Sequence, residues 1–255
     1  MWVKPSRCSD LGVVAIIQAR IGSTRLRGKV LESIMGEPML AHVVARSCAI
    51  RGVDEVVVAT TIRPEDEAIV DLCRDRRWPV FRGSEHDVLD RYFRAGVSVG
   101  AEHVVRITSD CPLVCPLEGA RVVQRHRETG ADYTHNITVW GSGMPLGTGV
   151  EVFTMQSLET SWQDGLEPHH REHVDEYVGE HPERFRIERV VAPPRLRRPE
   201  LRLTVDTPED LALVREIYRS LYRAGRVIPL DEVIALVDQN PELLELNRHV
   251  VQKPI

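Results

Sequence analysis

The stretch VVAIIQARIGSTRLRGKVL, residues 13–31, decides the fold of this chain. Its first part, residues 13–18, is a short apolar run that is rich in β-branched side chains and ends at Gln18. Such a run is typical of a strand buried on both faces, in the middle of a parallel sheet. The polar, glycine-containing residues that follow are expected to form a loop at the carboxyl end of that strand.

Strands and helices are predicted to alternate along the next hundred residues. Helical patterns cover residues 38–48, 64–74, 87–99 and 116–128. Strand-like runs between them cover residues 55–60, 79–81 and 103–107. This rhythm indicates βαβ crossovers, so we expect an α/β fold with a mostly parallel, Rossmann-like sheet and helices on both faces.

After Gly130 the rhythm loosens. Short strands are predicted over residues 132–135, 150–153, 186–191 and 201–205, which would add a small antiparallel extension. A helix is predicted over residues 207–222, with Thr207 as its cap and Pro208 in its first turn, and two more helical patterns close the chain. The expected organisation is a flexible tail (1–12), a main domain (13–225, extension at 130–200) and C-terminal helices (226–255).

Composition excludes several classes of protein. The 33 basic and 38 acidic side chains give a formal net charge of −5, which disfavours a general nucleic-acid binder. No apolar run is long enough for a membrane helix or a signal peptide, so we expect a cytoplasmic protein without a membrane partner. The five cysteines are odd in number and form no paired framework, which favours reduced thiols. The three lysines are Lys4, Lys29 and Lys253, so only Lys29 lies inside the predicted fold.

The loop after the first strand has the chemistry of an anion site. Glycines allow backbone amides to approach an anion, hydroxyls add donors, and arginine and lysine neutralise charge. The residues of these types are Arg20, Gly22, Ser23, Thr24, Arg25, Arg27, Gly28 and Lys29. The spacing is neither that of a Walker A loop nor that of a dinucleotide fingerprint. From residue types alone, a basic surface loop is an equal alternative.

The string itself resembles the signature of the cytidylyltransferase family, Q-A-R-x-G-S-x-R-L-P-G-K. It is especially similar to the branch of spore-coat polysaccharide biosynthesis proteins, with acylneuraminate and 3-deoxy-octulosonate cytidylyltransferases as more distant relatives. The matching residues are Gln18, Ala19, Arg20, Gly22, Ser23, Arg25, Leu26, Gly28 and Lys29; the chain departs at Arg27, where proline is usual. The resemblance implies a nucleotide-diphospho-sugar transferase (GT-A-like) fold whose loop holds a triphosphate, with Lys29, Arg20 and Arg25 as catalytic residues.

Two aspartates follow apolar runs and are candidates for a metal site. Asp110 ends RITSDCP and Asp206 lies in LTVDTPED. Hard carboxylates suit Mg²⁺ that bridges phosphate oxygens, although each aspartate could instead cap a turn or a helix. The resemblance implies that both bind the metal, and that Thr108 and Ser109 contact the nucleotide.

The resemblance also implies further binding residues. Near the nucleobase and ribose it places Gly83, Ser84, Asp87 and Arg91, although Ser84 or Asp87 could simply cap a helix. On the acceptor side it places Gly147, Glu151, Glu172 and His173. The departures collect here, because relatives often have an acidic residue at Gly149 and threonine at Asp175. The cluster of His169, His170 and His173 fits a polar helix surface as well as a metal site.

These features together predict a nucleotidyltransferase of nucleotide-sugar or polysaccharide biosynthesis. We expect it to transfer CMP from CTP to a sugar acid or related small acceptor, with Mg²⁺ as cofactor and pyrophosphate as product. One alternative is a glycosyltransferase of the same fold that uses a nucleotide sugar; another is a non-catalytic nucleotide-binding protein. A homodimer is compatible with the strand-forming second half.

Overall fold

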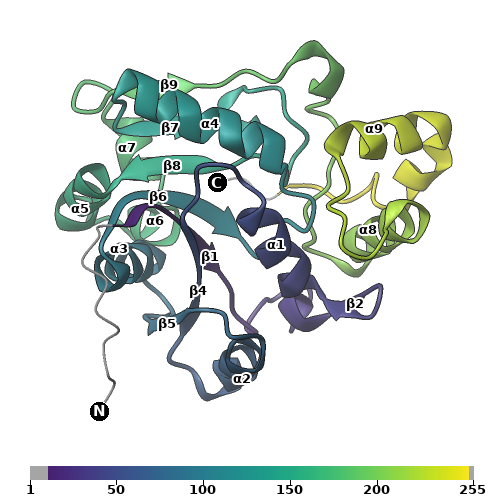
Figure 1. Ribbon diagram of the computed structural model, residues 1–255, viewed down its shortest axis with the longest axis horizontal. Coiled ribbons are helices and arrows are strands. Elements are labelled where there is room, and N and C mark those ends of the chain that lie inside the picture. The colour runs from purple at the N-terminus through teal and green to yellow at the C-terminus, as the bar shows by residue number, and fades with distance from the viewer. Residues whose placement is uncertain (1–10, 253–255) are drawn as a thin grey trace.

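A seven-stranded sheet forms the centre of the computed structural model, which describes residues 11–252 (Figure 1). Its strand order is β5-β4-β1-β6-β8-β7-β9. The strands are β1 (Leu11–Gln18), β4 (Glu55–Thr61), β5 (Val80–Gly83), β6 (Ala101–Thr108), β7 (Tyr133–His135), β8 (Glu151–Thr154) and β9 (Ile187–Arg189). Residues 1–10 of the predicted tail lie outside the described residues, whereas residues 11 and 12 belong to β1.

The sheet is parallel except at one strand. Strands β5, β4, β1 and β6 run parallel to one another. Strand β8 is antiparallel to both β6 and β7, and β9 is again parallel to β7. The prediction of a mostly parallel sheet with a small antiparallel part is therefore confirmed. A separate antiparallel pair, β2 (Ser33–Ile34) and β3 (Glu37–Pro38), was not predicted.

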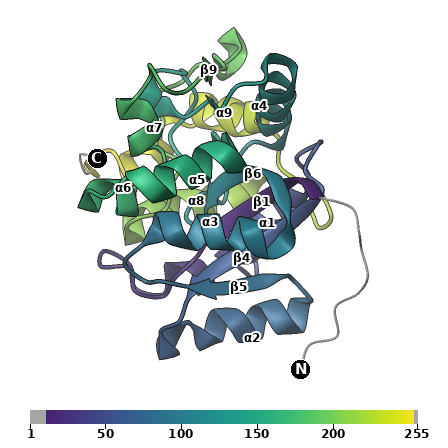
Figure 2. The same ribbon diagram turned by 90° about the vertical axis from the view of Figure 1, so that its left-hand side faces the viewer.

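Helices cover both faces of the sheet because β1 is apolar on both sides. Val13, Ala15 and Ile17 pack in the core beneath α1, α2 and α4, whereas Val14 and Ile16 pack in the core beneath α3 and α5. Figure 2 shows α3 and α5 together in front of the sheet. The helices are α1 (Met39–Cys48), α2 (Glu67–Arg76), α3 (Val88–Val99), α4 (Pro116–Thr129), α5 (Met155–Asp164), α6 (Pro168–Glu172) and α7 (Glu176–Glu180).

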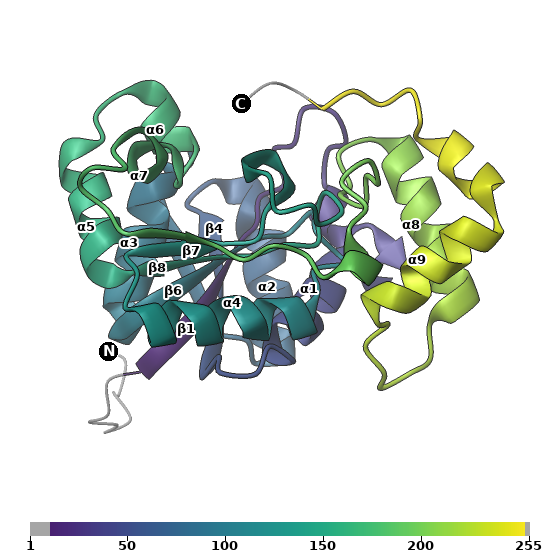
Figure 3. The ribbon, with the colours of Figure 1, turned by 90° about the horizontal axis from the view of Figure 1, so that it is seen from above.

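A third core lies beside the carboxyl ends of the strands. It is built by α8 (Pro208–Leu221) and α9 (Leu230–Gln239), which stand at the end of the sheet in Figure 3. Thr207 caps α8 as predicted, in a capping box with Asp210. Together with the short 3₁₀ helix Pro241–Leu246, α9 forms the C-terminal helical part.

The predicted strand over residues 201–205 is wrong. The segment is extended, but its one strand-like pairing is an isolated bridge from Arg202 to Leu146. Its apolar residues, Leu203 and Val205, are buried against the third core instead of within a sheet. The apolar residues therefore predicted a buried segment, but its hydrogen-bonding partners are not those of a sheet strand. No helix among residues 11–252 has the length and hydropathy needed to cross a membrane.

Candidate nucleotide and metal site

The carboxyl ends of β1 and β6 lie side by side and start two loops of the site. Gln18 pairs with Thr108 in the parallel register, and the amide of Ser109 donates to the carbonyl oxygen of Gln18 at 3.1 Å. The loop after β1 and the turn that contains Asp110 therefore leave the sheet together. This edge is where open α/β sheets bind ligands.

The loop after β1 is closed by hydrogen bonds from two of its backbone amides. The amide of Ile21 donates to Asp66 Oδ1 at 2.7 Å, and the amide of Gly28 donates to the carbonyl oxygen of Ile21 at 3.0 Å. Gly28 has φ of 71°, a left-handed conformation that glycine adopts without steric cost. Lys29 follows as the first residue of a 3₁₀ helix, so the closed loop fixes where its side chain begins.

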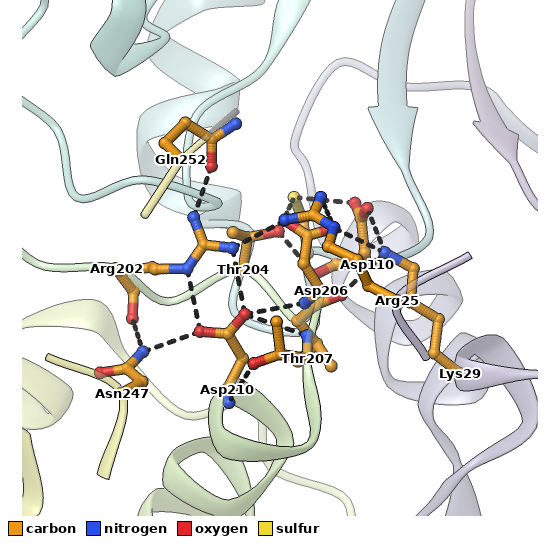
Figure 4. A network of polar contacts seen from close by, with 12 residues as sticks. Arg25, Lys29, Asp110, Arg202, Thr204, Asp206, Thr207, Asp210, Asn247 and Gln252 are labelled. Carbon is orange, nitrogen blue, oxygen red and sulfur yellow. Dashed lines mark hydrogen bonds and ion pairs between the residues drawn. The ribbon is translucent and has the colours of Figure 1, made fainter. Parts of the chain in front are cut away.

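Lys29 joins the two predicted metal-binding aspartates (Figure 4). Its Nζ donates to Asp110 Oδ2, to Asp206 Oδ1 and to the carbonyl oxygen of Val205, each at 2.8 Å. Burial disfavours the charged ammonium, but the two carboxylates outweigh it and raise the pKa of Lys29. Burial likewise favours neutral Asp110, but the Lys29 charge outweighs it and lowers the pKa of Asp110. Both groups are therefore ionised at neutral pH.

Two arginines also bind Asp206. Arg25 Nη2 lies 2.9 Å from Asp206 Oδ1, and Arg202 Nη2 donates to Asp206 Oδ2 at 2.7 Å. Arg202 in addition bridges to Asp210 at 2.9 and 3.0 Å, and Asn247 Nδ2 donates to Asp210 at 2.9 Å. The network in Figure 4 therefore holds Asp206 from the loop after β1 and from the start of α8.

A cleft of about 560 Å³ opens over these residues. It contains most of the nucleotide-binding and metal-binding candidates: Gln18, Ala19, Arg20, Ser23, Arg25, Lys29, Arg91, Thr108, Ser109, Asp110 and Asp206. It also contains all four acceptor-side candidates: Gly147, Glu151, Glu172 and His173. Arg27 is directed elsewhere, because its guanidinium pairs with Glu65 and its side chain is 74% exposed.

Four predicted nucleotide-binding residues do not line the cleft: Gly22, Gly83, Ser84 and Asp87. Asp87 caps α3 by accepting a hydrogen bond from the amide of Asp90 at 2.8 Å. The carbonyl oxygen of Ser84 accepts a hydrogen bond from the buried guanidinium of Arg91. The contacts of Asp87 are thus those of a helix cap. Ser84 positions Arg91, and Arg91 lines the cleft.

A second group of charges lies at the acceptor side. Arg106 and Glu151 are directly opposite each other on β6 and β8, and Arg106 Nη1 donates to Glu151 Oε2. The hydroxyl of Tyr133 donates to Glu151 Oε1 at 2.8 Å, and Asp175 Oδ1 lies 3.5 Å from Arg106 Nη1. Burial is the main reason that the pKa of Glu151 is raised to about 7, and Asp175 adds to it. Glu151 also lines the cleft.

Comparison with known proteins decides the family. A family model described as cytidylyltransferase matches residues 14–243. The chain belongs to the cytidylyltransferase family. It is thus an enzyme of the nucleotidyltransferase class, and the resemblance of the loop after β1 is confirmed.

Two relatives of this cytidylyltransferase match along nearly the whole chain. An uncharacterized protein of Methanocaldococcus jannaschii, MJ1063, is 37% identical, over 94% of this chain and 96% of its own length. The spore coat polysaccharide biosynthesis protein SpsF of Bacillus subtilis is 35% identical, over 90% and 95%.

Two solved structures share the cytidylyltransferase fold. A cytidylyltransferase from Leptospira borgpetersenii has a TM-score of 0.82 at 24% identity and covers 96% of this chain and 99% of its own. A CMP:2-keto-3-deoxy-manno-octonic acid synthetase complexed with CTP has a TM-score of 0.60 at 20% identity and covers 82% and 99%. The fold predicted from the resemblance is therefore confirmed.

In this cytidylyltransferase Asp110 and Asp206 are the donor set that could hold a metal. Asp110 Oδ2 and Asp206 Oδ1 converge on one point, the position of Lys29 Nζ. Mg²⁺ at nucleotide sites commonly takes one or two carboxylates and fills its remaining positions with phosphate oxygens and water. The two hard oxygen donors therefore fit a phosphate-chelated Mg²⁺.

The histidine cluster fits a metal poorly. His169 and His170 each contact one oxygen of Glu180, at 2.8 and 2.7 Å. Nδ1 of His170 also accepts a hydrogen bond from the amide of Glu167 in the cap of α6, at 3.3 Å. A neutral imidazole with an accepting Nδ1 carries its proton on Nε2, which leaves that atom no lone pair for a metal. His173 lies apart, in the cleft.

Sequence reasoning missed three contributors to the cytidylyltransferase site. Arg202 was missed because residues 201–205 were interpreted as a strand. Asp210 was missed because it lies in the first turn of the predicted helix, where an acidic residue is explained by helix capping. Asp175 was noted as a departure from the family pattern but was given no role. The pairing of Arg106 with Glu151 could have been predicted only with the β6–β8 register known.

Proposed function

We propose that the enzyme transfers CMP from CTP to a small acceptor, with Mg²⁺ as cofactor and pyrophosphate as the second product. The observation that carries this proposal is the convergence of Lys29, Asp110 and Asp206 on one point of the cleft. One cation and two carboxylates there suit a metal-chelated triphosphate. The acceptor would be a sugar acid or a related small molecule, as the family resemblance implies.

The chain's own residues provide the positioning that such a displacement needs. When the nucleotide binds, Lys29 and Arg25 exchange a carboxylate oxygen of Asp206 for phosphate oxygens, with Arg20 beside them in the cleft. Asp110 and Asp206 would hold Mg²⁺, which neutralises charge on the phosphates. Arg202 keeps Asp206 in place throughout, since it binds the other oxygen. In-line phosphoryl and nucleotidyl transfer depends mainly on such positioning and charge neutralisation.

The acceptor oxygen would approach from the side of Glu151 and Asp175. The cleft is continuous from Lys29 to these residues, so the α-phosphate and an acceptor fit within one space. A glycosyltransferase is disfavoured, because Asp110 is followed by Cys111 and Pro112 instead of forming an Asp-x-Asp metal motif. The structure of a similar protein complexed with CTP supports CTP as the nucleotide.

The experiment measures pyrophosphate release from CTP and Mg²⁺ with a panel of small acceptors. Lys29→Ala should lower the turnover number by at least about 10², the usual cost of losing one charged contact to a reacting phosphate. Arg27→Ala is the matched control and should retain wild-type turnover, because Arg27 faces Glu65 outside the cleft. Wild-type turnover by Lys29→Ala would contradict the proposal, and CTP binding without any turnover would favour a non-catalytic nucleotide-binding protein.

A further inference from the structure

The ammonium group of Lys29 has used all of its hydrogen-bonding capacity. An ammonium group carries three N–H donors, and those of Lys29 Nζ point to Asp110 Oδ2, Asp206 Oδ1 and the carbonyl oxygen of Val205, each at 2.8 Å. The residue is buried, with 8% of its surface exposed. Lys29 can therefore donate to a phosphate oxygen only after one of these three hydrogen bonds is broken.

The carboxylate of Asp206 is equally occupied. Its Oδ1 faces Lys29 Nζ at 2.8 Å and Arg25 Nη2 at 2.9 Å, and its Oδ2 accepts from Arg202 Nη2 at 2.7 Å. A carboxylate oxygen has about two lone-pair sites, so both sites of Oδ1 are taken. A metal ion could bind this oxygen only if Lys29 or Arg25 withdrew.

The charges of this network balance without a metal. Three carboxylates and three cationic side chains are connected by ion pairs: Asp110, Asp206, Asp210, Lys29, Arg25 and Arg202. A divalent cation added to the network would bring positive charge that no side chain of the network compensates, and it would compete with Lys29 for the same two carboxylate oxygens. A triphosphate changes this balance, because its oxygens can bind both the ammonium group and the metal.

We propose that Lys29 occupies the metal position of the nucleotide-free enzyme and keeps a divalent metal out until a triphosphate binds. The proposal rests on the metal-binding role of Asp110 and Asp206 proposed above and adds the order in which the ligands bind. Phosphate oxygens would draw Lys29 Nζ away from Asp206, and only then would Asp110 Oδ2 and Asp206 Oδ1 be available together. The metal therefore binds with the nucleotide or after it.

Binding of Mn²⁺ to the nucleotide-free protein tests this inference. Mn²⁺ suits the same carboxylate ligands as Mg²⁺, and electron paramagnetic resonance measures its free concentration. Lys29→Met removes the ammonium charge and keeps an unbranched side chain. This variant should bind Mn²⁺ at least about tenfold more tightly than the wild type, because the metal then has no like charge beside it at the two carboxylates. Adding Asp110→Asn to Lys29→Met should abolish the gained binding, which assigns it to this position.

Arg27→Met is the matched control. It removes a cation from the same loop, but Arg27 pairs with Glu65 outside the cleft, so the Mn²⁺ affinity should equal that of the wild type. Thermal unfolding checks that the variants are folded and gives a second readout. Mg²⁺ without nucleotide should raise the Tm of Lys29→Met and leave the Tm of the wild type unchanged, because a ligand stabilises only a folded state that binds it.

Two results would overturn the inference. One is Mn²⁺ binding by the nucleotide-free wild type that Asp110→Asn abolishes, and the other is an unchanged Mn²⁺ affinity in folded Lys29→Met. If Lys29→Met does not fold, the comparison of the wild type with Asp110→Asn still decides, since equal affinities support the inference. Failure of the transfer function would show separately, as an absence of pyrophosphate release from CTP, because the Mn²⁺ measurement involves neither nucleotide nor acceptor.

Discussion

At Asp206 three cationic side chains meet one carboxylate. Lys29 and Arg25 approach Oδ1, and Arg202 approaches Oδ2. The first two lie on the loop after β1, so they are the cations that a triphosphate would attract. Arg202 belongs to the same segment as Asp206 and also binds Asp210, so its role is to hold the carboxylate in position.

Replacing Arg202 with methionine should therefore destabilise the fold. Asp210 is fully buried, and breaking a buried ion pair by removing one partner costs about 3–5 kcal/mol. Asn247 and backbone amides still bind Asp210, so we expect about 3 kcal/mol, measured by urea denaturation. Arg198→Met is the control: its partners Glu200 and Asp238 are 61% and 49% exposed, so its loss should cost below about 1 kcal/mol. Equal losses for both variants would contradict the positioning role.

At the scale of elements, His126 couples helix α4 to the sheet. Its Nε2 contacts His103 Nδ1 of β6 at 3.1 Å, and its Nδ1 contacts Thr134 Oγ1 of β7 at 2.9 Å. Burial, aided by His103, lowers the pKa of His126 to about 4. His126 therefore stays neutral in the folded protein at pH values at which it is protonated in the unfolded chain.

The sign of the resulting pH dependence follows from linkage. Between the unfolded pKa, near 6.5, and the folded pKa, near 4, the unfolded state binds more protons, so stability falls as pH falls through this window. The loss attributable to His126 reaches up to about 3 kcal/mol. His126→Gln should make the unfolding free energy fall less steeply between pH 6.5 and 4, with the pKa of His135, which burial also lowers to about 4, sustaining the remaining slope. His86→Gln, whose side chain is 90% exposed, should leave the wild-type slope. An unchanged slope in His126→Gln would show that other groups dominate.

Elements of the first half were predictable because β1 and most of β4 are buried on both faces. Both strands contain continuous runs of β-branched apolar residues, and helix α4 begins with Pro116 and has Gly130 at its C-cap. The second half was less predictable, because residues 201–205 are extended and mostly buried without pairing in a sheet. Local pattern specifies which side chains are buried; the choice between a strand neighbour and a helical core is made by tertiary contacts.

At the scale of the whole molecule, the site joins the sheet to the C-terminal helices. Lys29 and Asp110 follow strands of the sheet, whereas Asp206 lies just before the cap of α8, and Lys29 and Asp206 are 177 positions apart in the chain. The motifs alone indicated the three side chains, and their meeting depended on the fold.

A ligand that bridges these two parts should stabilise the entire fold. At a CTP concentration of about 100 times Kd, with Mg²⁺, linkage gives about 2.7 kcal/mol, which corresponds to a rise in Tm of about 5–10 °C for a chain of this size. Differential scanning fluorimetry would measure this rise. CMP lacks the β and γ phosphates that Lys29 and Arg25 would bind and should give a smaller shift. Equal shifts with CMP and CTP would mean that the triphosphate lies elsewhere.

The reversed direction of β8 has a consequence for how this enzyme can diversify. Since β8 runs against β6, its first residue, Glu151, stands at the same rim as the ends of the parallel strands. The side chains at this rim therefore come from two separate stretches of the chain: the loops that follow the parallel strands, and the later segment that leads into β8. Exchanging residues 141–150 together with the α6–α7 junction would alter the choice of acceptor and leave the nucleotide machinery intact, so new specificities can evolve on an inherited reaction.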